Sequence, residues 1–272
     1  MTRAIRDFDI VLLDQRGTGK SSPITLNSLQ KVSDSSSGQA SFLAHFRADS
    51  IVRDCEKVKE ALKIQKWGAI LGQSFGGFCL TTYLSLFPNC TSIGLFTGGL
   101  PPVGTNIDDI YRSTYERCIV RNQRYFDRYP ADAAAIKQIY KIISANPVKL
   151  PSGGYLTPER FQQLGLSLGM QGSYERIHYL LSNAFEEGDD CLSYYFLRDF
   201  ESEQSFDTNI IYALLHEAIY CEGGQASNWS AERVKEEEKF KHCFDFGRCL
   251  ADEGDSPIYF TGKAEYPFVS HS

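Results

Sequence analysis

The most constraining feature of the sequence is a glycine-flanked serine in residues 72–77, which read Gly-Gln-Ser-Phe-Gly-Gly. An apolar stretch of strand length, residues 67–71, precedes this segment, and an apolar stretch compatible with a helix, residues 78–86, follows it. A strand that turns abruptly into a helix holds such a serine in a strained conformation, with its hydroxyl exposed above the helix N-terminus. The pattern therefore predicts a nucleophile elbow with Ser74 as the nucleophile.

The neighbours of Ser74 fit this prediction. Gly72 and Gly76 supply the Gly-x-Ser-x-Gly spacing that lets strand and helix approach, and Gly77 adds room for the helix to pack. The backbone N–H of Phe75 would donate a hydrogen bond to the oxyanion that forms when Ser74 attacks a carbonyl group. The alternative interpretation is a plain glycine-rich turn.

Composition favours a soluble globular enzyme. The chain has 272 residues, of which 42% are hydrophobic and 23% charged, enough for one domain or one domain with an insertion. A net charge of −6 without a basic patch argues against a nucleic-acid partner. No apolar run reaches the roughly 18 residues of a membrane span, and residues 1–7 lack the apolar core of a signal peptide. We therefore expect a cytoplasmic protein that does not bind membranes.

The eight cysteines do not resemble a disulfide scaffold or a metal site. They include no Cys-x-x-Cys pair and no His-Cys cluster with zinc spacing, and Cys243 and Cys249 form the closest pair. We expect reduced thiols, no metal and no cofactor.

Alternation of strand and helix patterns around the elbow predicts a parallel α/β sheet. Residues 8–14 form an apolar run that is typical of a buried parallel strand. Apolar residues at helical spacing from Asp49 to Leu62 predict an amphipathic crossover helix, and residues 92–99 predict another strand. Residues 31–40 are rich in serine and lack periodicity, so we expect a surface loop there.

The pattern changes after residue 101. Residues 101–255 contain long helical stretches rich in tyrosine, phenylalanine, arginine and glutamate, which predicts a helical cap over the hydrolase core of residues 1–100. Within the cap, the charge run of residues 231–241 is typical of a solvated helix face. Residues 257–262 predict a strand, in a segment 256–272 that returns toward the core.

Three motifs together resemble the proline iminopeptidases, or prolyl aminopeptidases, a serine peptidase family with the α/β-hydrolase fold. Residues 14–21 read Asp-Gln-Arg-Gly-Thr-Gly-Lys-Ser, the more discriminating motif, in which glutamine at the second position is typical of this family when a Gly-Gly-x-Pro-Pro segment also follows a later strand. The elbow of residues 72–77 is the second motif, and Thr-Gly-Gly-Leu-Pro-Pro at residues 97–102 is the third. Residues 214–220 and 226–229 also look like the cap of the larger members, so the similarity covers nearly the whole chain.

The resemblance implies release of an N-terminal residue, preferentially proline, from a peptide with a free N-terminus by acyl transfer through Ser74. Burying the charged amine of such a substrate is costly unless a carboxylate compensates it. Glu217 occupies the position where a cap glutamate of the family binds the amine. The alternative is that Glu217 is an ordinary helix residue paired with a lysine or arginine. Four other acids could share the role: Asp199, Glu201, Glu203 and Glu222.

The resemblance also implies parts that are not found in this sequence. Family members carry a His-Gly-Gly-Pro-Gly loop before the strand at residue 8, and that loop completes the oxyanion hole; Met1 stands after this point. A triad also needs an acid and then a histidine, each after a later strand. Glu265 and His271 are too close in sequence to have a helix and strand between them. We therefore expect the acid and the base to lie outside this chain.

The remaining histidines have structural interpretations. His178 reads as one face of a helix, and His216 is expected to pack within the cap; metal binding by either is disfavoured. His45 precedes the elbow, and His242 lies in the cap. We also expect Asp14 and Arg16 to form a pair that fixes the loop after their strand.

Two other classes of function remain open at this stage. The chain could be a catalytically incompetent fragment of such an enzyme, with exposed sheet edges and apolar faces. An esterase or lipase on the same fold would share the elbow, but not the signatures at Gln15 and at residues 101–102. Epoxide hydrolases and haloalkane dehalogenases are disfavoured because their nucleophile is aspartate, where this chain has Ser74.

Overall fold

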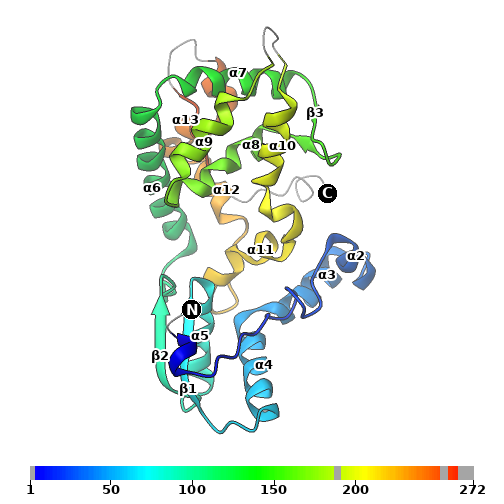
Figure 1. Cartoon of the computed structure of the whole chain (residues 1–272), viewed down its shortest axis with the longest axis vertical. Coiled ribbons are helices and arrows are strands. Elements are labelled where there is room, and N and C mark those ends of the chain that lie inside the picture. Colours follow the sequence, from blue (N-terminus) through cyan, green and yellow to red (C-terminus); the bar gives the residue numbers. More distant parts are fainter. Residues whose placement is uncertain (1–3, 187–190, 252–256, 263–272) are drawn as a thin grey trace. The chain divides into compact units, whose positions relative to one another are not determined.

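The chain divides into two compact units. The computed structural model describes residues 4–186, 191–251 and 257–262. The first unit comprises Met1–Gly104 with Thr208–Ala226, and the second comprises Thr105–Asp207 with Ser227–Ser272. Figure 1 labels their elements.

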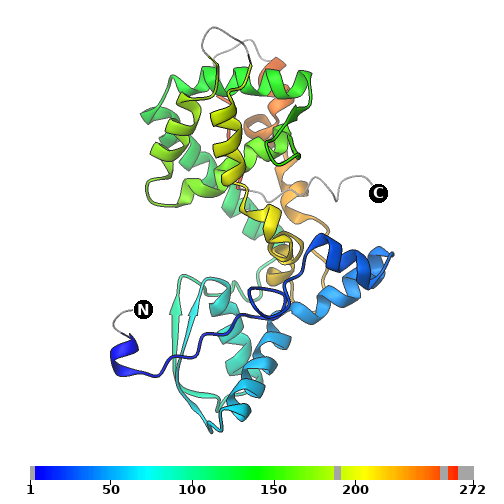
Figure 2. The ribbon, with the colours of Figure 1, turned by 45° about the vertical axis from the view of Figure 1, so that its right-hand side comes forward.

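A parallel pair of strands forms the centre of the first unit. β1 (Trp67–Gln73) pairs in register with β2 (Thr91–Thr97), so that Leu71 lies opposite Leu95. Helix α5 (Phe75–Leu86) packs on both strands, and helix α4 (Ala48–Ala61) packs on α5. Figure 2 shows both helices on one side of the strands. The strands predicted at residues 67–71 and 92–99, the crossover helix and the elbow helix are therefore confirmed.

The helix-covered face of β1 and β2 is apolar and buried, whereas the opposite face is open. Val52, Tyr83 and Cys90 form a small core between the helices and the strands. On the other face, the side chains of Leu71, Ile93 and Leu95 are exposed. Parallel sheets normally have both faces covered, so their strands carry apolar residues on both faces. The exposed apolar side chains of β1 and β2 follow this pattern.

Residues 8–14 do not form the predicted strand. They follow the short helix α1 (Ala4–Asp7) without regular secondary structure, and Leu12 is 71% exposed. A strand forms only where a neighbouring strand supplies partners for its N–H and C=O groups. In the part of the chain that the structure describes, β1 pairs with β2 and with no second neighbour. The apolar pattern was therefore not sufficient to make a strand.

The serine-rich residues 31–40 are helical, so the predicted surface loop is wrong there. α2 (Leu26–Val32) and α3 (Ser36–Leu43) flank a short break, and the 3₁₀ turn η1 (Ala44–Phe46) follows. Side chains cap both helices: Ser28 N–H donates to Thr25 Oγ1 at 3.1 Å, and Gly38 N–H donates to the Ser35 hydroxyl at 3.1 Å. Serine satisfies the free N–H groups at a helix start, so serine-rich sequence can mark helix ends.

Part of the predicted cap clusters with the first unit. This part begins at the last residue of the 3₁₀ turn η3 (Ser205–Thr208) and contains helix α11 (Ile210–Leu215) and the 3₁₀ turn η4 (Glu217–Tyr220). Thr208–Ala226 belongs to the unit that holds the elbow. The rest of residues 105–251 belongs to the second unit.

The second unit is mainly helical. Its elements are α6 (Ile107–Arg128), α7 (Asp132–Ala145), β3 (Val148–Lys149), β4 (Tyr155–Leu156), α8 (Pro158–Gln162), the 3₁₀ helix η2 (Gln163–Gly169), α9 (Ser173–Ser182), α10 (Tyr194–Ser202), α12 (Ser230–Lys235), α13 (Glu238–Phe244) and α14 (Phe246–Ala251). Aromatic rings fill the core, among them the fully buried Tyr125, Phe161 and Phe196. The charge run at 231–241 spans α12 and α13; it buries Val234 and Phe240 and points Lys239 toward Glu116.

Residues 257–262 pack into this helical core and do not form the predicted strand. Ile258 and Phe260 are fully buried. The side chain of Asn122 on α6 takes the place of a neighbouring strand: its Oδ1 accepts from Phe260 N–H at 2.8 Å, and its Nδ2 donates to Phe260 O at 2.9 Å. Gln162 donates in the same way to Tyr259 O. The remainder of segment 256–272, apart from 257–262, lies outside the described residues.

Candidate functional site

Ser74 stands at the junction of β1 and α5 in a strained conformation. Its φ of 51° and ψ of −123° place a non-glycine residue at positive φ, which surrounding contacts must hold in place. Ser74 N–H donates to Thr97 O at 3.0 Å, and Ser74 O accepts from Gly77 N–H at 2.9 Å. The residue is exposed. This is the strand–turn–helix geometry that the sequence predicts for an elbow, and it presents Ser74 to solvent.

Close backbone packing explains the glycines around Ser74. A Cβ atom at Gly72 would lie 2.4 Å from Gly76 O, and one at Gly77 would lie 1.9 Å from Gly99 O. Both distances are far below any van der Waals contact, and the obstacles are backbone atoms that cannot rotate away. The turn therefore tolerates no side chain at these two positions.

Phe75 is the first residue of α5. The first N–H groups of a helix have no acceptor within the helix, and the helix dipole places partial positive charge there. The Phe75 N–H is thus suitably placed to stabilise negative charge beside Ser74. Its role as an oxyanion donor stays a prediction.

The loop that follows residues 8–14 is anchored on α4. Arg16 forms a bidentate pair with Asp54, with Nε–Oδ2 and Nη2–Oδ1 distances of 2.7 and 2.6 Å, and donates from Nη1 to His45 O at 2.8 Å. The hydrogen bonds to Asp54 raise the pKa of the Arg16 guanidinium. Asp14 accepts from Lys20 N–H instead. The predicted Asp14–Arg16 pair is therefore wrong, because each residue fixes the loop through a different partner.

Glu217 lies in the same unit as Ser74 and is buried, with 9% of its surface exposed. It is the first residue of η4, a single 3₁₀ turn. Arg47, which precedes α4, donates from Nη2 to Ala218 O at 2.9 Å and to Cys221 O at 3.2 Å. The turn that carries Glu217 is thus attached to the helix that packs on α5.

A series of aromatic rings also joins this turn to the elbow helix. Ring centroids are 6.3 Å apart between Phe75 and Phe78, 5.7 Å between Phe78 and Tyr220, and 5.7 Å between Tyr220 and His216. Tyr212 stacks on His216 at 4.8 Å. Burial lowers the pKa of the His216 imidazole, against an opposing effect of Glu217. The buried environment of His216 therefore favours the neutral imidazole.

The other candidate acids have different locations. Asp199, Glu201 and Glu203 belong to the second unit; Glu201 accepts from Ser152 N–H at 3.1 Å, and Glu203 lies 3.6 Å from Arg176. Glu222 belongs to the first unit, where its carboxylate accepts from Gly104 N–H at 3.3 Å. Of the five acids, only Glu217 and Glu222 share a unit with Ser74.

None of the described histidines is hydrogen-bonded to the Ser74 hydroxyl. His45 O accepts from Arg16, and His178 contacts the Asp132 carboxylate at 3.0 Å while stacking on Tyr129 at 4.1 Å. His242 contacts the carbonyl oxygen of Glu238 at 3.2 Å. Glu265 and His271 lie outside the described residues. The described residues therefore present the candidate nucleophile Ser74 without a histidine bonded to its hydroxyl group.

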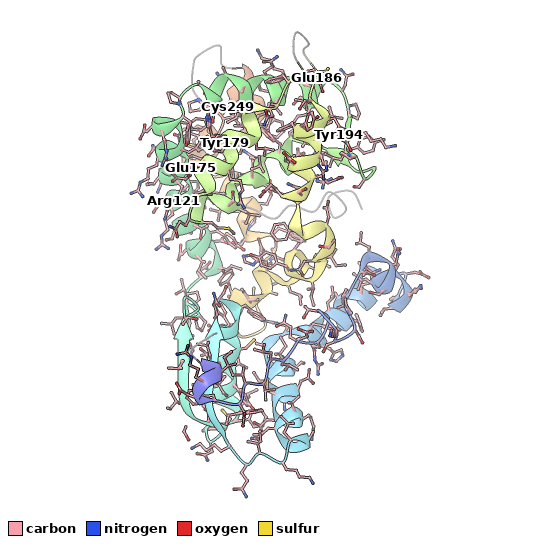
Figure 3. All side chains as sticks on the ribbon, in the orientation of Figure 1. Arg121, Glu175, Tyr179, Glu186, Tyr194 and Cys249 are labelled. Carbon is pink, nitrogen blue, oxygen red and sulfur yellow. The ribbon has the colours of Figure 1, made fainter. Side chains whose placement is uncertain are left out.

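Two clefts that the sequence did not reveal lie in the second unit. The larger, about 540 Å³, lies between α9 and α10 and is lined by Arg176, Tyr179, Leu180, Asn183, Asp199, Ser202 and Glu203. The smaller, about 390 Å³, includes Arg121 and Glu175, which Figure 3 labels together with Tyr179. Helical spacing of 176, 180 and 183 could have indicated a shared face on α9, but not its pairing with α10. Ser74 lines neither cleft.

Neither a membrane-spanning helix nor a metal-binding cluster is present among the described residues. No helix there is long and apolar enough to cross a membrane. No group of three or more histidine, cysteine, aspartate or glutamate side chains there is arranged to hold a metal ion.

Comparison with known proteins agrees with this geometry. Residues 2–137 match the family described as alpha/beta hydrolase fold. The chain is 46% identical over 267 residues to the proline iminopeptidase of Aeromonas sobria, a match over 98% of this chain and 60% of the relative. It is 36% identical over 270 residues to proline iminopeptidase aneH of Aspergillus aculeatus, a match over 95% of this chain and 57% of the relative.

The chain thus spans less than two thirds of the length of these relatives. The match to the hydrolase family covers half of the chain and includes β1, the elbow, α5 and β2. On this evidence the chain belongs to the alpha/beta hydrolase fold family.

Proposed function

We propose that this chain is a serine aminopeptidase-like hydrolase that releases an N-terminal residue, preferentially proline, from peptides. The observation that carries the proposal is the elbow, in which Ser74 is exposed at positive φ between β1 and α5. The likeness to two proteins named proline iminopeptidase supports the choice of substrate.

In this proposal Ser74 Oγ attacks the carbonyl carbon of the first residue of the peptide. The Phe75 N–H donates to the oxygen that becomes negatively charged, and the N-terminus of α5 adds its positive potential. The peptide nitrogen then leaves, an acyl-enzyme remains on Ser74, and water releases the amino acid. A base that is not among the described residues takes the proton of Ser74 and gives it to the leaving nitrogen, and the same base then activates the water.

Glu217 is proposed to bind the charged amine of the substrate. A buried carboxylate can compensate an ammonium or iminium group that leaves water, and Glu217 is 9% exposed in the same unit as Ser74. Such an anchor restricts cleavage to the N-terminus, because an internal residue has no free amine.

The division into a hydrolase core and a helical cap, and a cytoplasmic location, are also proposals. All eight cysteines are free thiols, which is typical of proteins from reducing compartments. The segment Thr208–Ala226 would be the part of the cap that approaches the elbow.

The test is turnover of a proline-linked chromogenic amide by the purified chain, with labelling by a fluorophosphonate probe. We expect Ser74→Ala to reduce turnover at least about a thousandfold and to abolish labelling. An amide that is N-acetylated on proline should not be cleaved. Folded protein that neither turns over the amide nor reacts with the probe would overturn the proposal and favour a catalytically incompetent fragment. Cleavage of simple esters but not of proline amides would favour an esterase.

A further inference from the structure

The turn that carries Glu217 has a dedicated clamp. Arg47 lies immediately before α4, and its Nη2 donates to Ala218 O at 2.9 Å and to Cys221 O at 3.2 Å. These carbonyl groups lie more than 170 positions away in the sequence. One guanidinium therefore joins two distant segments of the first unit.

Arg47 donates to carbonyl groups at the C-terminal end of the short 3₁₀ helix η4, where backbone carbonyl groups lack partners. The last carbonyl groups of a helix have no partner within it, and they carry partial negative charge that a cation stabilises. In η4, Ala218 O accepts one backbone bond, from Cys221 N–H at 3.2 Å. A single 3₁₀ turn has little stability of its own. Arg47 thus acts as a cap on the turn whose first residue is Glu217.

The clamp connects Glu217 to the frame that carries Ser74. α4 packs on α5 through a core that includes Val52 and Tyr83, and α5 begins directly after Ser74. In a second contact, the ring of Tyr220, the last residue of the turn, packs against Phe78 of α5. The Glu217 turn is therefore held by two contacts, one from Arg47 and one from Phe78, to elements fixed to the elbow.

We propose that Arg47 is a positioning residue, which fixes the Glu217 turn so that its carboxylate meets the substrate amine at a set distance from Ser74. The inference rests on the proposed function, since it assigns the amine to Glu217. Its physical basis is that a displacement of about 1 Å in a binding group can cost a large part of its effect. Arg47 itself does not touch the substrate.

The test measures binding, so that it does not depend on a complete triad. L-prolinamide and cyclopentanecarboxamide, in which a carbon replaces the ring nitrogen, are titrated by NMR into the full chain carrying Ser74→Ala. We expect Glu217→Gln to weaken prolinamide binding at least about tenfold and Arg47→Met to weaken it about three- to tenfold. Arg47→Lys, which keeps one donor, should fall between Arg47→Met and the unchanged arginine.

Three controls separate positioning from a general structural role. Neither Arg47→Met nor Glu217→Gln should change the affinity for cyclopentanecarboxamide, which has no amine. Arg53→Met removes an exposed arginine from α4 itself and should leave both affinities unchanged. The double variant Arg47→Met with Glu217→Gln should bind prolinamide no more weakly than Glu217→Gln alone, because the two residues act through one contact.

Each result distinguishes the clamp from the anchor. If Glu217→Gln weakens prolinamide binding and Arg47→Met does not, the clamp is wrong and the anchor survives. If Glu217→Gln has no effect on prolinamide binding, or the chain binds the two ligands equally well, Glu217 does not bind the amine. The positioning role of Arg47 is then wrong as well. If Arg47→Met weakens both ligands equally, its role is structural and the inference is overturned.

Discussion

Replacing Asn122 should release the buried segment 257–262 from the helical unit. Asn122 is fully buried, and its side chain satisfies both the N–H and the carbonyl group of Phe260. Asn122→Ala leaves two backbone groups in an apolar core, where each unsatisfied group costs about 1–3 kcal/mol. Cys118 Sγ keeps one weaker contact to Phe260 O at 3.3 Å. We therefore expect a loss of about 3 kcal/mol in the free energy that holds the segment closed.

Hydrogen exchange followed by mass spectrometry measures this free energy locally. A loss of about 3 kcal/mol corresponds to roughly hundredfold faster exchange of peptides that cover residues 257–262. Exchange of β1 and α5 in the first unit should be unchanged. Arg124→Ala, an exposed position on the same helix α6, is the matched control, with an expected effect within about 0.5 kcal/mol. If Asn122→Ala accelerates exchange by less than threefold, the amide does not replace a strand neighbour and the reasoning is refuted.

Two further predictions concern the elbow and the pH dependence of stability. Gly77→Ala would place a Cβ atom 1.9 Å from a backbone oxygen, whereas a Cβ atom at residue 76 would meet nothing within 4 Å. We therefore expect Gly77→Ala, but not Gly76→Ala, to abolish fluorophosphonate labelling. Equal labelling of the two variants would contradict the packing argument. The hydrogen bond from Ser230 and the charge of Arg233 lower the pKa of Asp108 below its ordinary value of 3.8. The ionised carboxylate therefore stabilises the fold fully at pH values above 3.8, and this contribution is lost as the pH falls through the lowered pKa. Asp108→Asn should therefore cost about 1 kcal/mol at pH 7 and progressively less below pH 3.8 in urea titrations; a cost independent of pH would refute this.

The part of the fold that the sequence predicts well is the part whose signals are local. Residues 67–97 alternate between strand and helix patterns around a glycine-flanked serine. Each of these patterns predicts its secondary-structure element from the local sequence alone. Even the strain at Ser74 follows from this context, because a strand can enter a helix this tightly only through an unusual backbone conformation. The prediction succeeded there because no distant residue had to be known.

The predictions that failed depended on partners distant in the sequence. The sequence of residues 8–14 is apolar whether or not another strand is present to pair with it. Among the described residues, no strand pairs with this segment. Residues 257–262 were predicted to be a strand because they are apolar, but Asn122 and Gln162 supply side-chain amides in place of a ladder. The helices at 26–43 were missed for another reason: serine marks both loops and helix caps.

The candidate site shows the same limit. Sequence pattern places Ser74 and Phe75, and the resemblance to a family places Glu217. That the Glu217 turn clusters with the elbow is a matter of contacts such as that between Arg47 and Cys221, separated by 174 positions. No periodicity encodes such a contact, so the clamp could be found only in the folded chain.

Each of the two units contains one tryptophan, so the unfolding of each unit can be followed by intrinsic fluorescence. The chain has two tryptophans: Trp67 opens β1 in the first unit, where its indole N–H donates to the Tyr83 hydroxyl at 3.0 Å, and Trp229 precedes α12 in the second and is about half exposed. Indole emission depends on burial and hydrogen bonding, so the two side chains start from different environments. A chain with Trp229→Phe would report by fluorescence on the unit that carries the elbow, and one with Trp67→Phe on the helical unit. Unfolding curves of the two variants would thus show directly whether the two units of the chain unfold together or one after the other.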